Sequence, residues 1–96
     1  MYAVIRRYEG VQSIDDVVRR VGEGLAPLIS QMPGYVAYWA IDAGGGTVAS
    51  VTIFEDRSGV EEATRRAAGW VQENLASLIP NPPQVTMGEI VLGNPQ

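Results

Sequence analysis

The chain has 96 residues and a formal net charge of −4, and it contains no His, Cys or Lys. These absences exclude sites built on histidine or cysteine ligands, a thiolate nucleophile or a Schiff-base amine. Carboxylates, Tyr, Arg, Asn and aromatic surfaces remain for any chemistry. The acidic balance argues against a nucleic-acid partner, which would require a basic surface.

Composition and length predict one small domain over residues 1–96, because 46% of the residues are hydrophobic. No stretch approaches the roughly 20 apolar residues that span a bilayer, and the first residues have a strand pattern instead of a signal peptide. We therefore expect a cytoplasmic protein with no membrane partner. A domain this small without disulfides is marginal alone, which favours an oligomer.

The first half of the chain predicts a strand followed by an interrupted helix. Alternating β-forming residues predict the strand over Tyr2–Tyr8. Ser13, with Asp16 three residues later, gives an approximate capping signal before an apolar stripe that ends at Leu25. Pro27 cannot continue the helical hydrogen bonds, so the helix must bend or restart there.

The second half predicts three more strands and a long helix. Residues 35–41 and 47–55 predict strands joined by a glycine-rich hairpin loop, which opens onto a strand and so is not a phosphate cradle. Ser58 and Glu61 form a capping box for a helix that extends to about Leu78. A fourth strand is expected over residues 84–92, followed by a frayed tail over 93–96.

The order β-α-β-β-α-β predicts an α+β ferredoxin-like plait: four antiparallel strands in order 4-1-3-2, with two helices on one face. Alternation along the second strand places Tyr35, Ala37, Trp39 and Ile41 on one face. Because both faces of the sheet carry apolar side chains, we expect a homodimer packed sheet on sheet.

An RNA-recognition module shares this order of elements but carries a basic, aromatic-rich third strand. Residues 47–54 contain one aromatic side chain and no basic one, which excludes that class. Three stretches are informative instead: Met32–Tyr35, Ile53–Asp56 and the Ala-rich second helix that carries Trp70. On these stretches the chain resembles the antibiotic biosynthesis monooxygenase-like group of the dimeric α+β barrel superfamily.

The resemblance implies a dimer with a cavity between sheet and helices. The best-known members of the group oxidise polycyclic aromatic substrates with molecular oxygen and no metal or flavin. Others degrade haem, isomerise lactones or have no assigned activity. Haem-degrading members hold iron through a histidine, which this chain lacks. We therefore expect no cofactor.

Trp70 and Asn74 are candidate catalytic residues, four apart on one face of the second helix. In the functional interpretation Asn74 donates a hydrogen bond to a ligand oxygen and Trp70 is a stacking wall. In the structural alternative Trp70 is core and Asn74 bonds a helix end or a loop.

Arg6 and Arg7 point to opposite faces of a central strand, so at least one is directed inward or into the dimer interface. An inward arginine could hold an anionic substrate, with Glu89 on the neighbouring strand setting its orientation. The structural alternative is a plain Arg–Glu89 pair across the two strands.

Tyr38, Trp39 and Phe54 are candidate substrate-binding residues; Tyr38 and Trp39 face opposite ways, so one of them lines the helix side. The sequence thus predicts a protein that handles a small, aromatic molecule and resembles a cofactor-independent monooxygenase. Two alternatives stay open: a non-catalytic ligand-binding or regulatory module, and a structural homodimer without activity.

Overall fold

A computed structural model of the chain describes residues 1–93. The strands form one antiparallel sheet in the order β2-β3-β1-β4, which confirms the predicted plait and strand order. The last three residues of the predicted tail lie outside the described residues. The elements are β1 (Tyr2–Tyr8), α1 (Ile14–Arg20), the π-helical turn η1 (Val21–Leu25), α2 (Ala26–Ser30), β2 (Tyr35–Gly44), β3 (Thr47–Phe54), α3 (Arg57–Asn74) and β4 (Gln84–Glu89).

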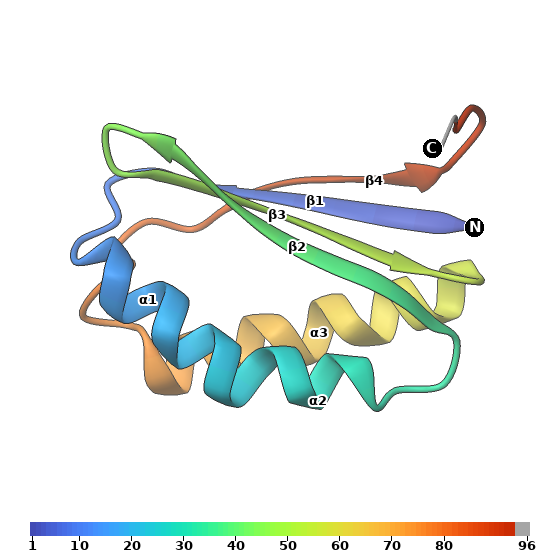
Figure 1. The fold of residues 1–96 in the computed structure, drawn as a ribbon, viewed down its shortest axis with the longest axis horizontal. Helices are drawn as coiled ribbons and strands as arrows, with labels where there is room; N and C mark the ends of the chain where they lie inside the picture. Colours follow the sequence, from blue (N-terminus) through green and yellow to red (C-terminus); the bar gives the residue numbers. More distant parts are fainter. Residues whose placement is uncertain (94–96) are drawn as a thin grey trace.

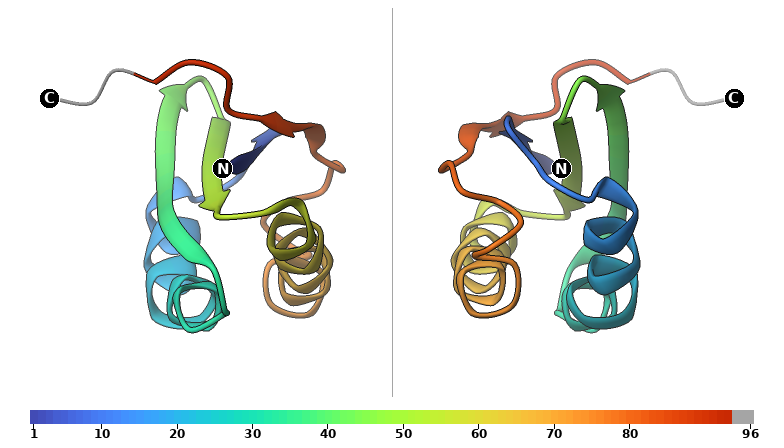
Figure 2. Two further views of the ribbon diagram at one scale, coloured as in Figure 1. Left: turned by 90° about the vertical axis from the view of Figure 1, so that its right-hand side faces the viewer. Right: turned by 90° about the vertical axis from the view of Figure 1, so that its left-hand side faces the viewer.

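The helices form a second layer against one face of the sheet (Figures 1 and 2). The first three helical segments make one rod that lies beside α3. α2 packs against β2, and α3 packs against β1 and β3. The opposite, outer face of the sheet carries no helix within the described part of the chain.

The rod continues through the position where a break was expected. The change of bonding pattern comes earlier, in η1, where the N–H of Ala26 donates to the carbonyl of Val21 five residues back. Pro27 lies in the first turn of α2, directly after this π-helical turn. The expected bend or restart at Pro27 is thus replaced by a wide turn just before it.

Both helix caps differ from the predicted ones. The hydroxyl of Ser13 donates to Asp16 Oδ2 at 3.2 Å and caps no backbone amide. α3 is capped by Asp56, whose Oδ1 accepts from the N–H of Gly59 at 3.0 Å and from the hydroxyl of Ser58 at 2.9 Å. Asp56 takes this position because it is extended and directly precedes the helix.

The last helix and the last strand are shorter than predicted. α3 ends at Asn74, and a turn follows in which the N–H of Leu78 donates to the carbonyl of Leu75 at 2.9 Å. β4 ends at Glu89 because its partner β1 begins at Tyr2, the residue opposite. Residues 90–92 of the predicted extension lie beyond the strand, although the N–H of Ile90 still donates to the carbonyl of Met1 at 2.8 Å.

A bulge near the start of β2 moves one aromatic ring to the other face. Tyr35 lies opposite Phe54, but the next pair in register is Ala37 with Ile53, so Val36 is an extra residue. Tyr35 consequently joins the helix face, where its ring meets Phe54 edge-on with centroids 5.9 Å apart. The prediction that Tyr35 shares a face with Trp39 was wrong for this reason.

Two clusters of buried side chains fill the space between the layers. The first, here called the Phe54 cluster, consists of Val4, Leu25, Ile29, Met32, Phe54, Val60, Ala63 and Ala67. The second, the Leu75 cluster, consists of Tyr8, Val11, Val17, Val48 and Leu75.

Candidate functional site

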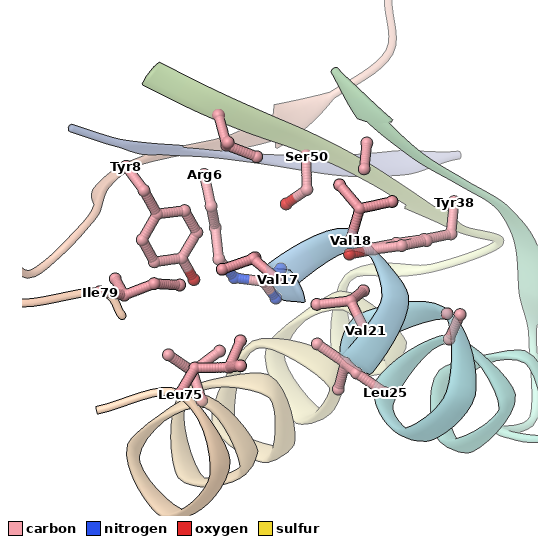
Figure 3. Close-up of a pocket in the computed structure, with 15 residues that line it drawn as sticks. Arg6, Tyr8, Val17, Val18, Val21, Leu25, Tyr38, Ser50, Leu75 and Ile79 are labelled. Atoms are coloured by element: carbon pink, nitrogen blue, oxygen red, sulfur yellow. The ribbon is translucent and has the colours of Figure 1, made fainter. Parts of the chain in front are cut away.

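A cavity of about 170 Å³ lies between the sheet and the helices, beside the Leu75 cluster. We call it the inner cavity (Figure 3). Its lining is apolar except for four side chains on the sheet: Arg6, Tyr8, Tyr38 and Ser50. Figure 3 shows the side chain of Arg6 extending into the cavity between Tyr8 on one side and Tyr38 on the other.

Arg6 occupies a position in β1 where the strand alternation demands an inward side chain. Ser50 of β3 and Val85 of β4 lie opposite it. Its side chain is only 3% exposed. Its Nε and Nη2 atoms are buried and have no hydrogen-bond partner among the described residues.

The charge of Arg6 is uncompensated, since no carboxylate lines the cavity. Burial lowers the pKa of Arg6 because the charged guanidinium loses water. Arginine nevertheless stays protonated in proteins. The site therefore holds a buried cation in an apolar enclosure, which is costly without a counter-charge.

The two tyrosines of the cavity are hydrogen-bond donors at neutral pH. Burial raises the pKa of both Tyr8 and Tyr38, and the nearby positive charge of Arg6 offsets part of that rise. Their hydroxyls stay protonated, so neither can act as a general base near pH 7. Together with Ser50, the two tyrosines place three hydroxyl groups around the guanidinium, and a ligand in the cavity can accept hydrogen bonds from them.

A second, outer cavity of about 460 Å³ lies between α3, β4 and the loop that joins them. It shares Arg6, Tyr8, Val71 and Ile79 with the inner cavity, so these side chains stand between the two spaces. The loop is tied to the segment that follows β1 by two hydrogen bonds: Asn81 Nδ2 donates to the carbonyl of Glu9 at 3.1 Å, and the N–H of Gln12 donates to the carbonyl of Leu78 at 2.9 Å.

The structure brings Arg6 and Tyr38 of the predicted site residues together in the inner cavity. Arg7, as expected from the alternation, points the other way; it is exposed and pairs with Glu9 at 3.4 Å. The predicted Arg–Glu89 pair is wrong, because Glu89 lies opposite Tyr2. The register thus separates Glu89 from Arg6 by four residues along β1.

Trp39 and Phe54 do not line the inner cavity. Trp39 lies opposite Val51, and paired residues of neighbouring strands point to the same face, which here is the outer face of the sheet. Trp39 is 57% exposed there. Phe54 is fully buried within its own cluster.

Trp70 and Asn74 lie together, as their spacing predicted, but along a groove between η1 and α3 that is separate from the inner cavity. Asn74 Nδ2 donates to the carbonyl of Trp70 at 2.9 Å, and the carbonyl of Asn74 accepts from Arg20 at 3.1 Å. These bonds cap the end of α3, which agrees with the structural alternative for Asn74. Trp70 packs partly buried against both clusters.

Sequence reasoning missed Tyr8 and Ser50 as site residues. Tyr8 shares the inward phase of β1 with Arg6, which the alternation alone could have shown. Ser50 faces Arg6 only through the β1–β3 register, and a sequence does not fix a register between strands so far apart in the chain.

Within residues 1–93, no group of three or more Asp or Glu side chains is placed to hold a metal ion. Over the same residues, each helix is too short or too polar to cross a membrane.

No family model matches this sequence, and no curated protein does. Several solved structures share its fold. A protein of unknown function from Nitrosomonas europaea is 21% identical, with a TM-score of 0.76, covering 99% of this chain and 93% of that one. The cofactor-independent oxygenase SnoaB from Streptomyces nogalater is 12% identical, with a TM-score of 0.75, covering 99% and 97%.

A monooxygenase from Streptomyces coelicolor, in complex with nanaomycin D, is 17% identical, with a TM-score of 0.71, covering 96% of this chain and 92% of that one. These likenesses extend over nearly the full length of each chain. The protein therefore has the fold of the antibiotic biosynthesis monooxygenases.

Proposed function

We propose that this protein binds the anion of a small aromatic molecule in the inner cavity and oxygenates it with O₂, without metal or flavin. The observation that carries the proposal is Arg6, a cation 3% exposed among apolar walls with no carboxylate beside it. A ligand anion would supply the missing counter-charge. Its ionised form would be favoured by the same interaction.

The chemistry needs a substrate that is its own reductant. A substrate carbon bearing two hydrogens loses one as a proton to water, and the resulting anion gives one electron to O₂. The substrate radical and superoxide then combine into a peroxide. Loss of water from the protonated peroxide leaves a carbonyl group, so both oxygen atoms are accounted for.

The protein's own residues would bind and shield this anion. Arg6 favours the deprotonated substrate, and the hydroxyls of Tyr8 and Tyr38 donate hydrogen bonds to its oxygens. Since neither tyrosine is a base at neutral pH, the substrate must be acidic enough to ionise itself. The fold shared with a cofactor-independent oxygenase supports this assignment.

The test compares Arg6→Met with Arg7→Met, because Arg7 is the same residue type one position along and faces outward. Aromatic acids, phenols and anthrone-like compounds are screened by thermal shift, and O₂ consumption is followed with those that bind. We expect binding and oxygen uptake to be lost in Arg6→Met and kept in Arg7→Met. Equal behaviour of the two variants would contradict the proposal.

A second candidate is binding without turnover, as in a regulatory module. It is favoured by the absence of a carboxylate or histidine base in the lining of the inner cavity. It predicts Arg6-dependent thermal stabilisation by an anion with no O₂ consumption for any ligand that binds. A structural dimer without activity predicts no thermal stabilisation by anions and no O₂ consumption.

We also propose that two copies pair through the outer face of the sheet. Ile5, Val51 and Trp39 lie opposite one another there, in one apolar row across β1, β3 and β2. Trp39 is 57% and Ile5 43% exposed, so pairing would remove a large apolar surface from water. Light scattering should show a dimer that Trp39→Glu dissociates and Leu28→Glu, on the helical side, leaves intact.

A further inference from the structure

We infer that the anion bound at Arg6 is planar and presents two adjacent oxygens that share its charge, as a carboxylate or a 1,3-dicarbonyl enolate does. A lone phenolate oxygen would fit less well. The inference rests on the proposed function, because it names the ligand chemistry of the same cavity.

The two donors that need a partner lie on the same edge of the guanidinium. The buried, unpartnered atoms of Arg6 are Nε and Nη2. In a planar guanidinium, Nε–H and the nearer N–H of Nη2 point in parallel, and this pair matches two oxygens of one anion. An anion with one oxygen would leave one buried donor unpaired, which weakens binding by roughly tenfold.

The charge balance points to a single negative charge on the ligand. Arg6 is the one formally charged side chain that lines either cavity in the described part of the chain. Tyr8, Tyr38 and Ser50 are neutral donors around it. A monoanion would bring the enclosed charge to zero, whereas a second negative charge would be buried without a partner.

The volumes of the two cavities indicate which part of the ligand each cavity would hold. The inner cavity, about 170 Å³, is comparable with the roughly 150 Å³ apolar cavity that holds one benzene in another protein. It is smaller than the roughly 300–1,000 Å³ of typical ligand pockets. The outer cavity, about 460 Å³, meets it at Arg6 and Tyr8.

We therefore place one aromatic ring of the ligand in the inner cavity and the paired oxygens at Arg6. A larger apolar substituent would extend past Tyr8 into the outer cavity. This describes a ring-bearing organic acid or enolate with apolar groups on both sides of its charge.

Calorimetric titration of the wild-type protein tests the inference with matched ligands. They are 2-naphthoate, the enolate of the open-chain 1-phenyl-1,3-butanedione and 6-cyano-2-naphtholate, each above its pKa, and neutral 2-naphthamide. We expect at least one of the two-oxygen anions to bind roughly tenfold or more tightly than the one-oxygen naphtholate. Binding of the enolate is compatible with the proposed oxygenation. Binding of the carboxylate alone would support the two-oxygen inference but assign the cavity to binding without turnover, because a carboxylate is not the carbanion that reduces O₂.

The variant Arg6→Lys keeps the positive charge and removes the parallel donors. It should lose the preference for two-oxygen anions while it still binds the naphtholate. Should this variant fail to fold, the wild-type Nε–H resonance of Arg6 in NMR spectra is the second measurement. It should move downfield with naphthoate and much less with the naphtholate.

The outcomes separate the two proposals. Equal wild-type affinity for one-oxygen and two-oxygen anions, with both lost in Arg6→Met, would overturn the two-oxygen inference and leave the anion site in place. If neutral naphthamide bound as tightly as every anion, the proposal that Arg6 forms an anion site would be contradicted.

Discussion

The space between the sheet and the helices differs between its two ends, although inward side chains of β1 contribute to both. Along β1, the inward residues Tyr2 and Val4 pack against the Phe54 cluster, whereas Arg6 and Tyr8 line the cavity. The first end is tightly filled, whereas the second, hollow end encloses the cavity, whose largely apolar walls surround the buried guanidinium of Arg6. The difference begins at a single step of the strand alternation, from Val4 to Arg6.

Small residues make the filled end tight. A side-chain carbon on Gly59 would lie 2.6 Å from the Phe54 ring, and Ala63 and Ala67 on the next turns of α3 are fully buried. The helix therefore approaches the sheet closely there. We infer that the filled end supplies most of the stability and permits the hollow end to carry an unfavourable buried charge.

The largest expected effect is loss of the ring at the centre of the filled end. Phe54→Ala should lower the free energy of unfolding by about 3–5 kcal/mol, which could unfold so small a domain. Leu75→Ala, at the hollow end, should cost less, near the lower limit of the roughly 2–5 kcal/mol typical of its type, because part of its surface faces empty space. Urea denaturation measures both, and equal losses would contradict the comparison.

At the hollow end the expected change has the opposite sign. Arg6→Met replaces a buried, unpartnered cation by an apolar chain and should raise the free energy of unfolding by about 1–3 kcal/mol. Thr52→Val is the matched control, since Thr52 Oγ1 is also buried without a partner but lies outside both cavities. Both variants should be more stable in denaturation, and only Arg6→Met should lose anion binding.

Much of the fold was predictable because its signals are local. Strand alternation, proline positions and loop glycines gave the element order, and the order with right-handed crossovers gave the sheet. The predictions were wrong where a neighbouring residue determines the local structure. Asp56 displaced Ser58 as the cap of α3, and the bulge at Val36 turned Tyr35 to the other face.

The candidate site was predicted only in part. Alternation placed either Arg6 or Arg7 inward, but only the three-dimensional arrangement shows that Arg6 lacks a carboxylate partner. Trp70 and Asn74 were correctly placed on one helix face, yet which face meets the cavity depends on the rotation of α3 against the sheet. That rotation is a property of packing and has no signature in the spacing of two residues.

A smaller effect tests how closely the helices must approach. A side-chain carbon on Gly24 would lie 2.6 Å from Trp70 Cζ2, so Gly24→Ala should displace this half-buried ring and cost about 1 kcal/mol. Gly69→Ala is the control, because nothing lies within 4 Å of the added carbon. It should stabilise α3 by roughly 0.5–1 kcal/mol through helix propensity. Thermal unfolding of both variants would show whether the signs differ.

The smallest expected effect is a loss of stability in alkali that originates at the hollow end. Burial raises the pKa of Tyr8 and Tyr38 above the ordinary 10.0. Their contribution is fully present below about pH 10 and is lost as the pH rises towards the folded-state values, because the unfolded chain releases these protons first. Tyr8→Phe should make the melting temperature fall less steeply above about pH 10.

Arg6→Met should change the same profile in the other direction. The charge of Arg6 now favours each tyrosinate and limits the rise in pKa, so its removal leaves burial unopposed. The melting temperature should then decline more steeply with pH than in the wild-type protein. An unchanged slope of melting temperature against pH in both variants would contradict this prediction. It would mean that Arg6 and the two tyrosines do not interact electrostatically across the cavity.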